Sequence, residues 1–107
     1  MGALQGDANA ELDRLYSRLD EETAKFGQIA VDTAQAKADY KLEFTKAFFE
    51  ATGSLGSREK AADLAAMGYY RRKEVAEALE KSQRLVLSGI IEQMGACRTV
   101  IASARLV

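Results

Sequence analysis

The sequence contains no histidine and no proline, and it has a single cysteine, Cys97. A zinc site has little support, because a single thiol without histidines supplies too few ligands. A catalytic cysteine has little support either, because no histidine is present to act as its base. One cysteine also excludes an intramolecular disulfide, and we interpret Cys97 as a buried structural thiol on an apolar stripe. Because proline is absent, no residue forces a break within a long helix.

Signals for strands and for targeting are missing as well. Val, Ile and Thr never form alternating runs bounded by turn residues, so strands are not expected. The first ten residues lack the basic start and the apolar core of a signal peptide. No run approaches the roughly eighteen apolar residues of a membrane span. We therefore expect a cytoplasmic protein that does not bind a membrane.

Helix-forming residues dominate what the sequence does contain. Ala, Leu, Glu, Lys and Arg are abundant, and the 107 residues carry a net charge of −1. This composition is typical of long helices and coiled coils, and its bulk charge does not point to a nucleic acid. Residues 1–52 hold six Lys/Arg and ten Asp/Glu, whereas residues 53–107 hold nine and six. An acidic half and a basic half favour folding onto each other, although exposed pairs contribute only about 0–1 kcal/mol each.

A seven-residue repeat predicts a first helix over about residues 10–51. Its positions are Leu12, Leu19, Phe26, Thr33, Tyr40 and Ala47. Apolar companions follow three or four residues later, which indicates a coiled-coil-like seam. Asp7 or Asn9 is the expected N-cap, so we expect residues 1–9 to be flexible. Gly27 is unfavourable inside this helix by about 1 kcal/mol, and a close helix contact would explain its presence.

A cluster of glycine and hydroxyl residues at 52–57 predicts a turn into a second helix over about residues 57–104. Gly53 suits the left-handed conformation that often follows the end of a helix. Ser54 or Ser57 can then cap the second helix through its hydroxyl oxygen. The turn therefore reverses the direction of the chain.

Folding about this turn gives the predicted fold class. It is an all-α protein of two long antiparallel helices, a coiled-coil-like helical hairpin that forms a single domain over residues 10–107. In the expected register, Tyr40 meets Tyr70 and Phe26 approaches Arg84.

The apolar face of residues 85–101 is wider than one partner helix can cover, because Leu85, Leu87, Ile91 and Val100 lie beside its central stripe. A two-helix hairpin also encloses little core. We therefore expect self-association into a four-helix-bundle dimer or a higher oligomer. The predicted self-association residues are Leu12, Leu15, Leu19, Phe26, Val86, Ile90, Ile91, Met94 and Ile101.

The run most suggestive of a ligand is Tyr-Tyr-Arg-Arg-Lys at residues 69–73. Aromatic rings stack on bases and cations neutralise phosphates, but consecutive helical residues point about 100° apart and do not form one patch. We favour packing of Tyr69 or Tyr70 on Tyr40, with the cations contacting acids of the first helix. Single-stranded DNA is the alternative partner. The residues predicted to bind it are Tyr69, Arg71, Arg72, Lys73 and Arg84.

Three segments carry a resemblance to a known group of proteins: ADYKLEFTKAFFEATGS at 38–54, REKAA at 58–62 and RRKEVAEA at 71–78. Together with Arg98 and Arg105, they resemble small uncharacterised helical-hairpin proteins of tailed bacteriophages and prophages, over about residues 34–105. The resemblance implies a role near phage recombination and replication, in the cytoplasm of a bacterial host. It brings no catalytic residue with it.

The sequence contains no nucleophile–base pair, metal-ligand set, phosphate loop or cofactor motif. We therefore expect no enzyme, no catalytic residues, no cofactor and no metal. The expected function is that of a non-enzymatic, phage-type interaction protein that self-associates and binds another protein, a host or phage factor, through charged faces near the turn. The alternative is an accessory of phage DNA recombination or replication that binds single-stranded DNA or a recombinase.

Overall fold

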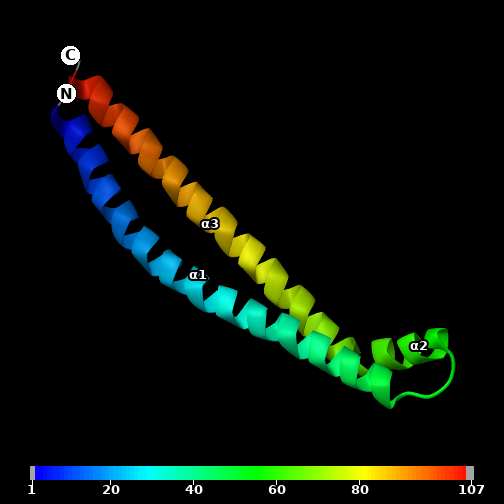
Figure 1. Ribbon diagram of the computed structural model, residues 1–107. Helices are drawn as coiled ribbons and strands as arrows, with labels where there is room; N and C mark the ends of the chain where they lie inside the picture. Colours follow the sequence, from blue (N-terminus) through cyan, green and yellow to red (C-terminus); the bar gives the residue numbers. More distant parts are fainter. Residues whose placement is uncertain (1, 106–107) are drawn as a thin grey trace. The chain divides into compact units, whose positions relative to one another are not determined.

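The computed structural model describes residues 2–105, and these are helical apart from a connection at 51–54 and a single turn residue, Ala66 (Figure 1). The helices are α1 (Gly2–Glu50), α2 (Leu55–Ala65) and α3 (Met67–Arg105). No strand occurs among the described residues, so the predicted all-α class is confirmed. Two of the three helices are long and extended, as expected. The predictions for Met1 and for residues 106–107 lie outside the described part of the chain.

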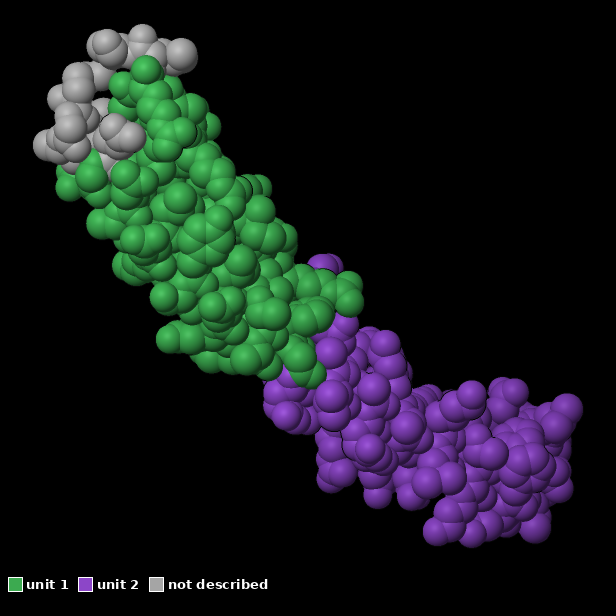
Figure 2. Space-filling view, turned by 60° about the vertical axis from the view of Figure 1, so that its left-hand side comes forward, with its two compact units in different colours: residues 1–27, 82–107 green, residues 28–81 purple. Residues whose placement is uncertain are grey.

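Contacts group the chain into two compact units, which Figure 2 colours separately. Unit 1 combines Met1–Gly27 with Ser82–Val107, and unit 2 is the intervening segment Gln28–Lys81. Each unit therefore contains part of α1 and a later part of the chain. The sequence predicted one domain over residues 10–107 and gave no sign of this division.

Unit 1 contains a small apolar core between α1 and α3. Leu15, Ile90 and Met94 are buried there. Four half-buried side chains pack against them: Leu12, Leu19, Val86 and Cys97. Side chains at heptad spacing thus face the partner helix, because a seven-residue repeat keeps one face of a helix turned to the same side.

Two cross-helix contacts show the direction of the paired segments in unit 1. The Arg98 guanidinium donates a hydrogen bond to the Tyr16 hydroxyl over 2.8 Å, while Gln83 donates to the Glu22 backbone carbonyl over 2.9 Å. A later residue of α1 thus meets an earlier residue of α3, so the two segments run antiparallel within this unit.

The fully buried side chains of unit 2 are small or polar. Its buried residues in the described structure are Ala62, Ala66 and Thr33. The Thr33 hydroxyl oxygen lies 2.8 Å from the Ile29 carbonyl oxygen and 3.1 Å from the Ala76 carbonyl oxygen, so it links α1 to α3. Thr33 is the polar member of the heptad repeat, and its burial is possible because the hydroxyl finds an acceptor on either side.

The beginning of α1 differs from the sequence prediction. The helix begins at Gly2, so the predicted start at Ala10 and the predicted N-caps at Asp7 and Asn9 are wrong. Ala8 is buried, and such packing stabilises turns of helix that the low helix propensity of glycine and asparagine disfavours. The flexibility expected of this segment stays a prediction.

The connection at 51–54 has the conformation that its residues favour. Gly53 has a φ of 105°, which side-chain-bearing residues rarely adopt, so the positive φ predicted there is confirmed. Ser54 is the N-cap of α2, and its hydroxyl accepts a hydrogen bond from the Ser57 N–H over 3.2 Å. Ser57 itself lies inside α2. The sequence left the N-cap open between Ser54 and Ser57, and the structure assigns it to Ser54. Because α2 begins at Leu55, its first residues lie within the turn predicted at 52–57.

The predicted second helix is two helices, separated at Ala66. The backbone of Ala66 has φ −94° and ψ 4°, while its N–H still bonds the Ala62 carbonyl and its carbonyl accepts from the Tyr70 N–H, both over 2.9 Å. This change of ψ lies in a region open to ordinary L-residues, so it requires neither proline nor a special motif. The continuous helix predicted from 57 to 104 is wrong for this reason.

By length and composition, α3 could cross a membrane. It contains an 18-residue window with a mean hydropathy of 1.3, of which 17% is buried in the described structure. By this measure, the expectation that no segment approaches a membrane span is wrong. The expectation considered unbroken apolar runs, whereas a mean hydropathy over 18 residues tolerates a few charged side chains within the window. The core helix of a soluble protein can pass the same test, so the expected lack of membrane binding stays a prediction.

Candidate functional site

The predicted self-association residues all lie in unit 1, and the structure divides them by exposure. Four of them are buried between the helices of one chain: Leu15, Ile90, Met94 and Ile101. Four are half-buried: Leu12, Leu19, Phe26 and Val86. Ile91 is 55% exposed. The buried members therefore hold the chain's own helices together, and only the others present surface that a second copy could contact.

Two large apolar side chains of α3 remain on the surface of unit 1. Leu85 is 68% exposed and Ile91 is 55% exposed. Leu87 and Val100 are half-buried. The sequence placed Leu85 beside the apolar stripe but did not include it among the self-association residues. Both side chains contribute to the exposed apolar surface of residues 85–101, which we call the α3 apolar face.

A polar contact lies next to this apolar core. Gln83 is buried, and its side-chain amide donates to the Glu22 carboxylate over 2.6 Å as well as to the Glu22 carbonyl. This hydrogen bond is the main cause that holds the pKa of Glu22 below its ordinary value, and the nearby Lys25 ammonium lowers it further. Nothing in the sequence pattern identified the pair, because it depends on side chains at the edge of the heptad face.

An aromatic cluster joins α1 to α3 in unit 2. The rings of Tyr40 and Tyr70 meet edge-on, with centroids 5.4 Å apart, which confirms the packing favoured from the sequence. The Lys73 ammonium lies 4.8 Å from the Tyr70 centroid and pairs with Glu74 at 2.8 Å and Glu77 at 3.5 Å. The Glu74 carboxylate raises the pKa of Lys73. Both acids belong to α3, so the expectation that Lys73 contacts acids of the first helix is wrong.

The other residues of the nucleic-acid alternative do not gather around this cluster. The Arg72 guanidinium lies 5.1 Å from the Tyr69 ring centroid, and both residues line a hollow that also contains Asp32 and Asp39. Arg71 approaches the Met67 sulfur at 3.8 Å.

Arg84 belongs to the other unit. Its guanidinium stacks 5.6 Å from the Phe26 centroid, as the predicted register required. The five predicted DNA-binding residues therefore have different surroundings, and their role stays a prediction.

A second hollow in unit 2 was not predicted. It has a volume of about 350 Å³ and lies between the end of α1 and the middle of α2. Its lining residues are Phe44, Thr45, Phe48, Phe49, Glu59 and Asp63, and we call it the phenylalanine–carboxylate hollow. The sequence signal was present in the aromatic residues before the turn and in the two acids four residues apart after it. To recognise that these residues line one hollow, it was necessary to know how α2 runs beside the end of α1.

Cys97 and the acidic residues complete the search for chemical groups. Cys97 is half-buried against the core of unit 1, so its predicted place on the apolar stripe is confirmed. Between residues 2 and 105, no group of three or more His, Cys, Asp or Glu side chains is arranged to hold a metal ion.

Comparisons with known proteins give no relative to set beside this geometry. No family model matches the chain, and neither the curated proteins nor the solved structures contain a match. The resemblance to phage proteins noted from three sequence segments therefore stays a prediction.

Proposed function

We propose that this chain is a non-enzymatic interaction protein that self-associates through the α3 apolar face of unit 1 and also binds another protein. The observation that carries the proposal is the exposure of Leu85 and Ile91 in the apolar segment of α3, at 68% and 55%. Large contiguous apolar surface is uncommon on soluble monomers and marks interaction sites.

The positions of Leu85 and Ile91 indicate how a second copy would pack. They are six residues apart, which places them about 120° from each other around a helix. Ile91 lies about 60° from Met94 and so at the edge of the buried stripe, whereas Leu85 lies about 180° from Met94, on the opposite side of α3. Because α1 packs against the stripe, it cannot cover both of these side chains. Two further helices from a second copy would do so, and the assembly would be a four-helix bundle.

A protein partner explains the α3 apolar face better than a lipid bilayer does. Glu92 and Arg98 lie within this face's segment, and Arg98 is bonded to the Tyr16 hydroxyl of α1. Charged side chains at the centre of a bilayer are costly. A bundle of helices places such side chains at its rim, where water and neighbouring polar groups solvate them.

Binding of single-stranded DNA by a phage recombination accessory is the weaker proposal. Lys73 is already paired with Glu74 and Glu77, and Asp32 and Asp39 line the same hollow as Arg72. Carboxylates beside the cations oppose the approach of phosphates. The structure thus offers fewer free cations near residues 69–73 than the sequence suggested.

Light scattering coupled to size-exclusion chromatography tests the self-association. The monomer mass is 11.7 kDa, and we expect a mass at least twice as large at micromolar concentration. The double variant Leu85→Glu, Ile91→Glu should elute as a monomer with its helix content unchanged, because both side chains are already exposed in one chain.

Val31→Glu is the matched control. Val31 is 62% exposed and belongs to unit 2, so it is not part of the α3 apolar face. This variant should retain the mass of the parent. A parent that remains a monomer, or a control that dissociates as fully as the double variant, contradicts the proposal. Flotation of the parent with lipid vesicles, combined with a monomeric mass in solution, would assign the face to a membrane instead.

A further inference from the structure

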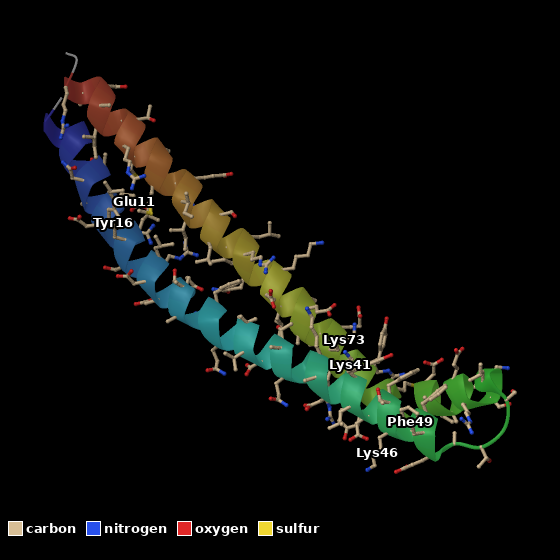
Figure 3. The ribbon with its side chains drawn as sticks, viewed as in Figure 1. Glu11, Tyr16, Lys41, Lys46, Phe49 and Lys73 are labelled. Carbon is tan, nitrogen blue, oxygen red and sulfur yellow. The ribbon has the colours of Figure 1, made fainter. Side chains whose placement is uncertain are left out.

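The phenylalanine–carboxylate hollow combines aromatic surface with unpaired negative charge. Figure 3 labels Phe49 in the last turns of α1, next to α2. The side chain is 75% exposed, and its ring meets the Phe48 ring edge-on with centroids 5.8 Å apart. Exposure of so large an apolar side chain costs about 25 cal/mol for each Å². A ligand that covers Phe49 would recover this free energy.

The acidic side of the hollow is formed by Glu59 and Asp63, which lie four residues apart on α2. Like charges at this spacing face each other across one helical turn and destabilise a helix by about 0.2–0.5 kcal/mol. Both side chains are exposed, and neither forms an ion pair or a hydrogen bond with another described residue. Arg58 and Lys60 are their neighbours in sequence, yet they pair with neither acid. The repulsion is therefore not offset by a pairing with any described residue.

These features point to a positively charged occupant. A cation between the carboxylates would neutralise them, and the faces of phenylalanine rings attract ammonium and guanidinium groups by about 0.5–2 kcal/mol. The long aliphatic stems of Lys and Arg also cover apolar surface while the charged head reaches polar groups. Phosphates and anionic lipids, in contrast, would be repelled by Glu59 and Asp63.

We propose that the phenylalanine–carboxylate hollow docks a cationic amphipathic segment of another protein, with a Lys or Arg side chain held between the two carboxylates and the phenylalanine rings. The inference rests on the proposed role as an interaction protein and specifies the chemistry of its partner. It does not depend on self-association, because the hollow lies in unit 2 and the α3 apolar face lies in unit 1.

Fluorescence anisotropy tests the inference with a labelled helical peptide of lysine, leucine and alanine. A peptide with glutamate in place of lysine is the matched probe. We expect the lysine peptide to bind and the glutamate peptide not to bind. The Phe49→Ala variant and the double variant Glu59→Gln, Asp63→Asn should each bind the lysine peptide about tenfold more weakly, because each removes a central contact. Phe49 is exposed, so its truncation should leave the fold intact.

The double variant Asp20→Asn, Glu21→Gln is the control for bulk charge. It removes the same two charges from exposed residues of unit 1, and it should bind the lysine peptide as the parent does. Equal weakening in both double variants would reduce the effect to non-specific attraction and overturn the inference, as would no binding of the lysine peptide. If the Glu59, Asp63 variant instead lowers the oligomer mass by light scattering, the occupant is a second copy and the inference is wrong. A parent chain that binds the lysine peptide but remains a monomer would contradict only the proposed self-association.

Discussion

The contact between Glu22 and Gln83 makes the stability of unit 1 depend on pH. The Gln83 amide donates to the ionised carboxylate, and this hydrogen bond lowers the pKa of Glu22 in the folded chain. A carboxyl group with a lowered folded pKa stabilises the fold above its unfolded pKa, and that stability is lost as the pH falls through the folded value. Unit 1 should therefore lose stability under acid.

Replacing Glu22 with glutamine tests this linkage. The Glu22→Gln variant cannot ionise at this position, so its free energy of unfolding should fall less than that of the parent between about pH 7 and about pH 3. Urea denaturation followed by circular dichroism at both pH values measures the difference. Glu21→Gln is the control, since Glu21 is exposed and bonds no other described residue. A Glu22→Gln variant with the acid sensitivity of the parent would show that the carboxylate contributes nothing.

Single residues also show what could be predicted from the sequence. The Tyr40–Tyr70 contact and the stacking of Arg84 on Phe26 followed from the register, because large side chains at heptad positions have little choice of neighbour. The direction of Lys73 did not follow. A long flexible cation can reach several acids, and the local geometry of α3 selects Glu74 and Glu77 over the first helix.

At the scale of helices and turns, glycine has opposite effects at two positions. Gly53 has a φ of 105°, so Gly53→Ala should destabilise the chain by about 1 kcal/mol or more. Gly27 lies inside α1. Apart from its chain neighbours and the adjoining backbone of its own helix, no heavy atom lies within 4 Å of a Cβ placed there. The close helix contact expected at Gly27 is therefore wrong, and Gly27→Ala should stabilise α1 by about 0.5–1 kcal/mol.

Thermal and urea unfolding of the two alanine variants measure these opposite shifts. Gly56→Ala is the control for the turn, since Gly56 lies in the first turn of α2 with open space around its Cβ position. It should not destabilise the chain as Gly53→Ala does. If Gly27→Ala proves destabilising, a contact made outside the single chain, such as one in an oligomer, must occupy that surface.

Helix identity was predictable from the sequence, but helix boundaries were only partly so. Ser54 and Gly53 mark the end of the connection because their side-chain and backbone chemistry acts locally. The start of α1 at Gly2 and the interruption at Ala66 depend on packing, since Ala8 and Ala66 are both buried. Alanine carries no boundary signal of its own. The phenylalanine–carboxylate hollow was not predicted because its two sides come from separate helices, and their proximity also depends on packing.

At the scale of the whole molecule, the two units differ in what they bury. Unit 1 encloses large apolar side chains, among them Leu15, Ile90 and Met94. The buried side chains described in unit 2 are smaller or polar, namely Thr33, Ala62 and Ala66. Burial of a large aliphatic side chain contributes about 1.5–3 kcal/mol, whereas alanine contributes much less. Unit 1 should therefore resist local opening better than unit 2.

Native-state hydrogen exchange measured at two protein concentrations tests this difference together with the proposed assembly. Amides of unit 1 should exchange more slowly than those of unit 2, because local opening there must expose Leu15, Ile90 and Met94. Dilution should speed exchange in unit 1 selectively, since a second copy on the α3 apolar face stabilises that unit by mass action. The Leu85→Glu, Ile91→Glu variant should show no such dependence on concentration. Equal protection of both units would contradict the inferred difference in stability between their cores. If dilution below the dissociation range leaves exchange in unit 1 unchanged, assembly through this face is contradicted.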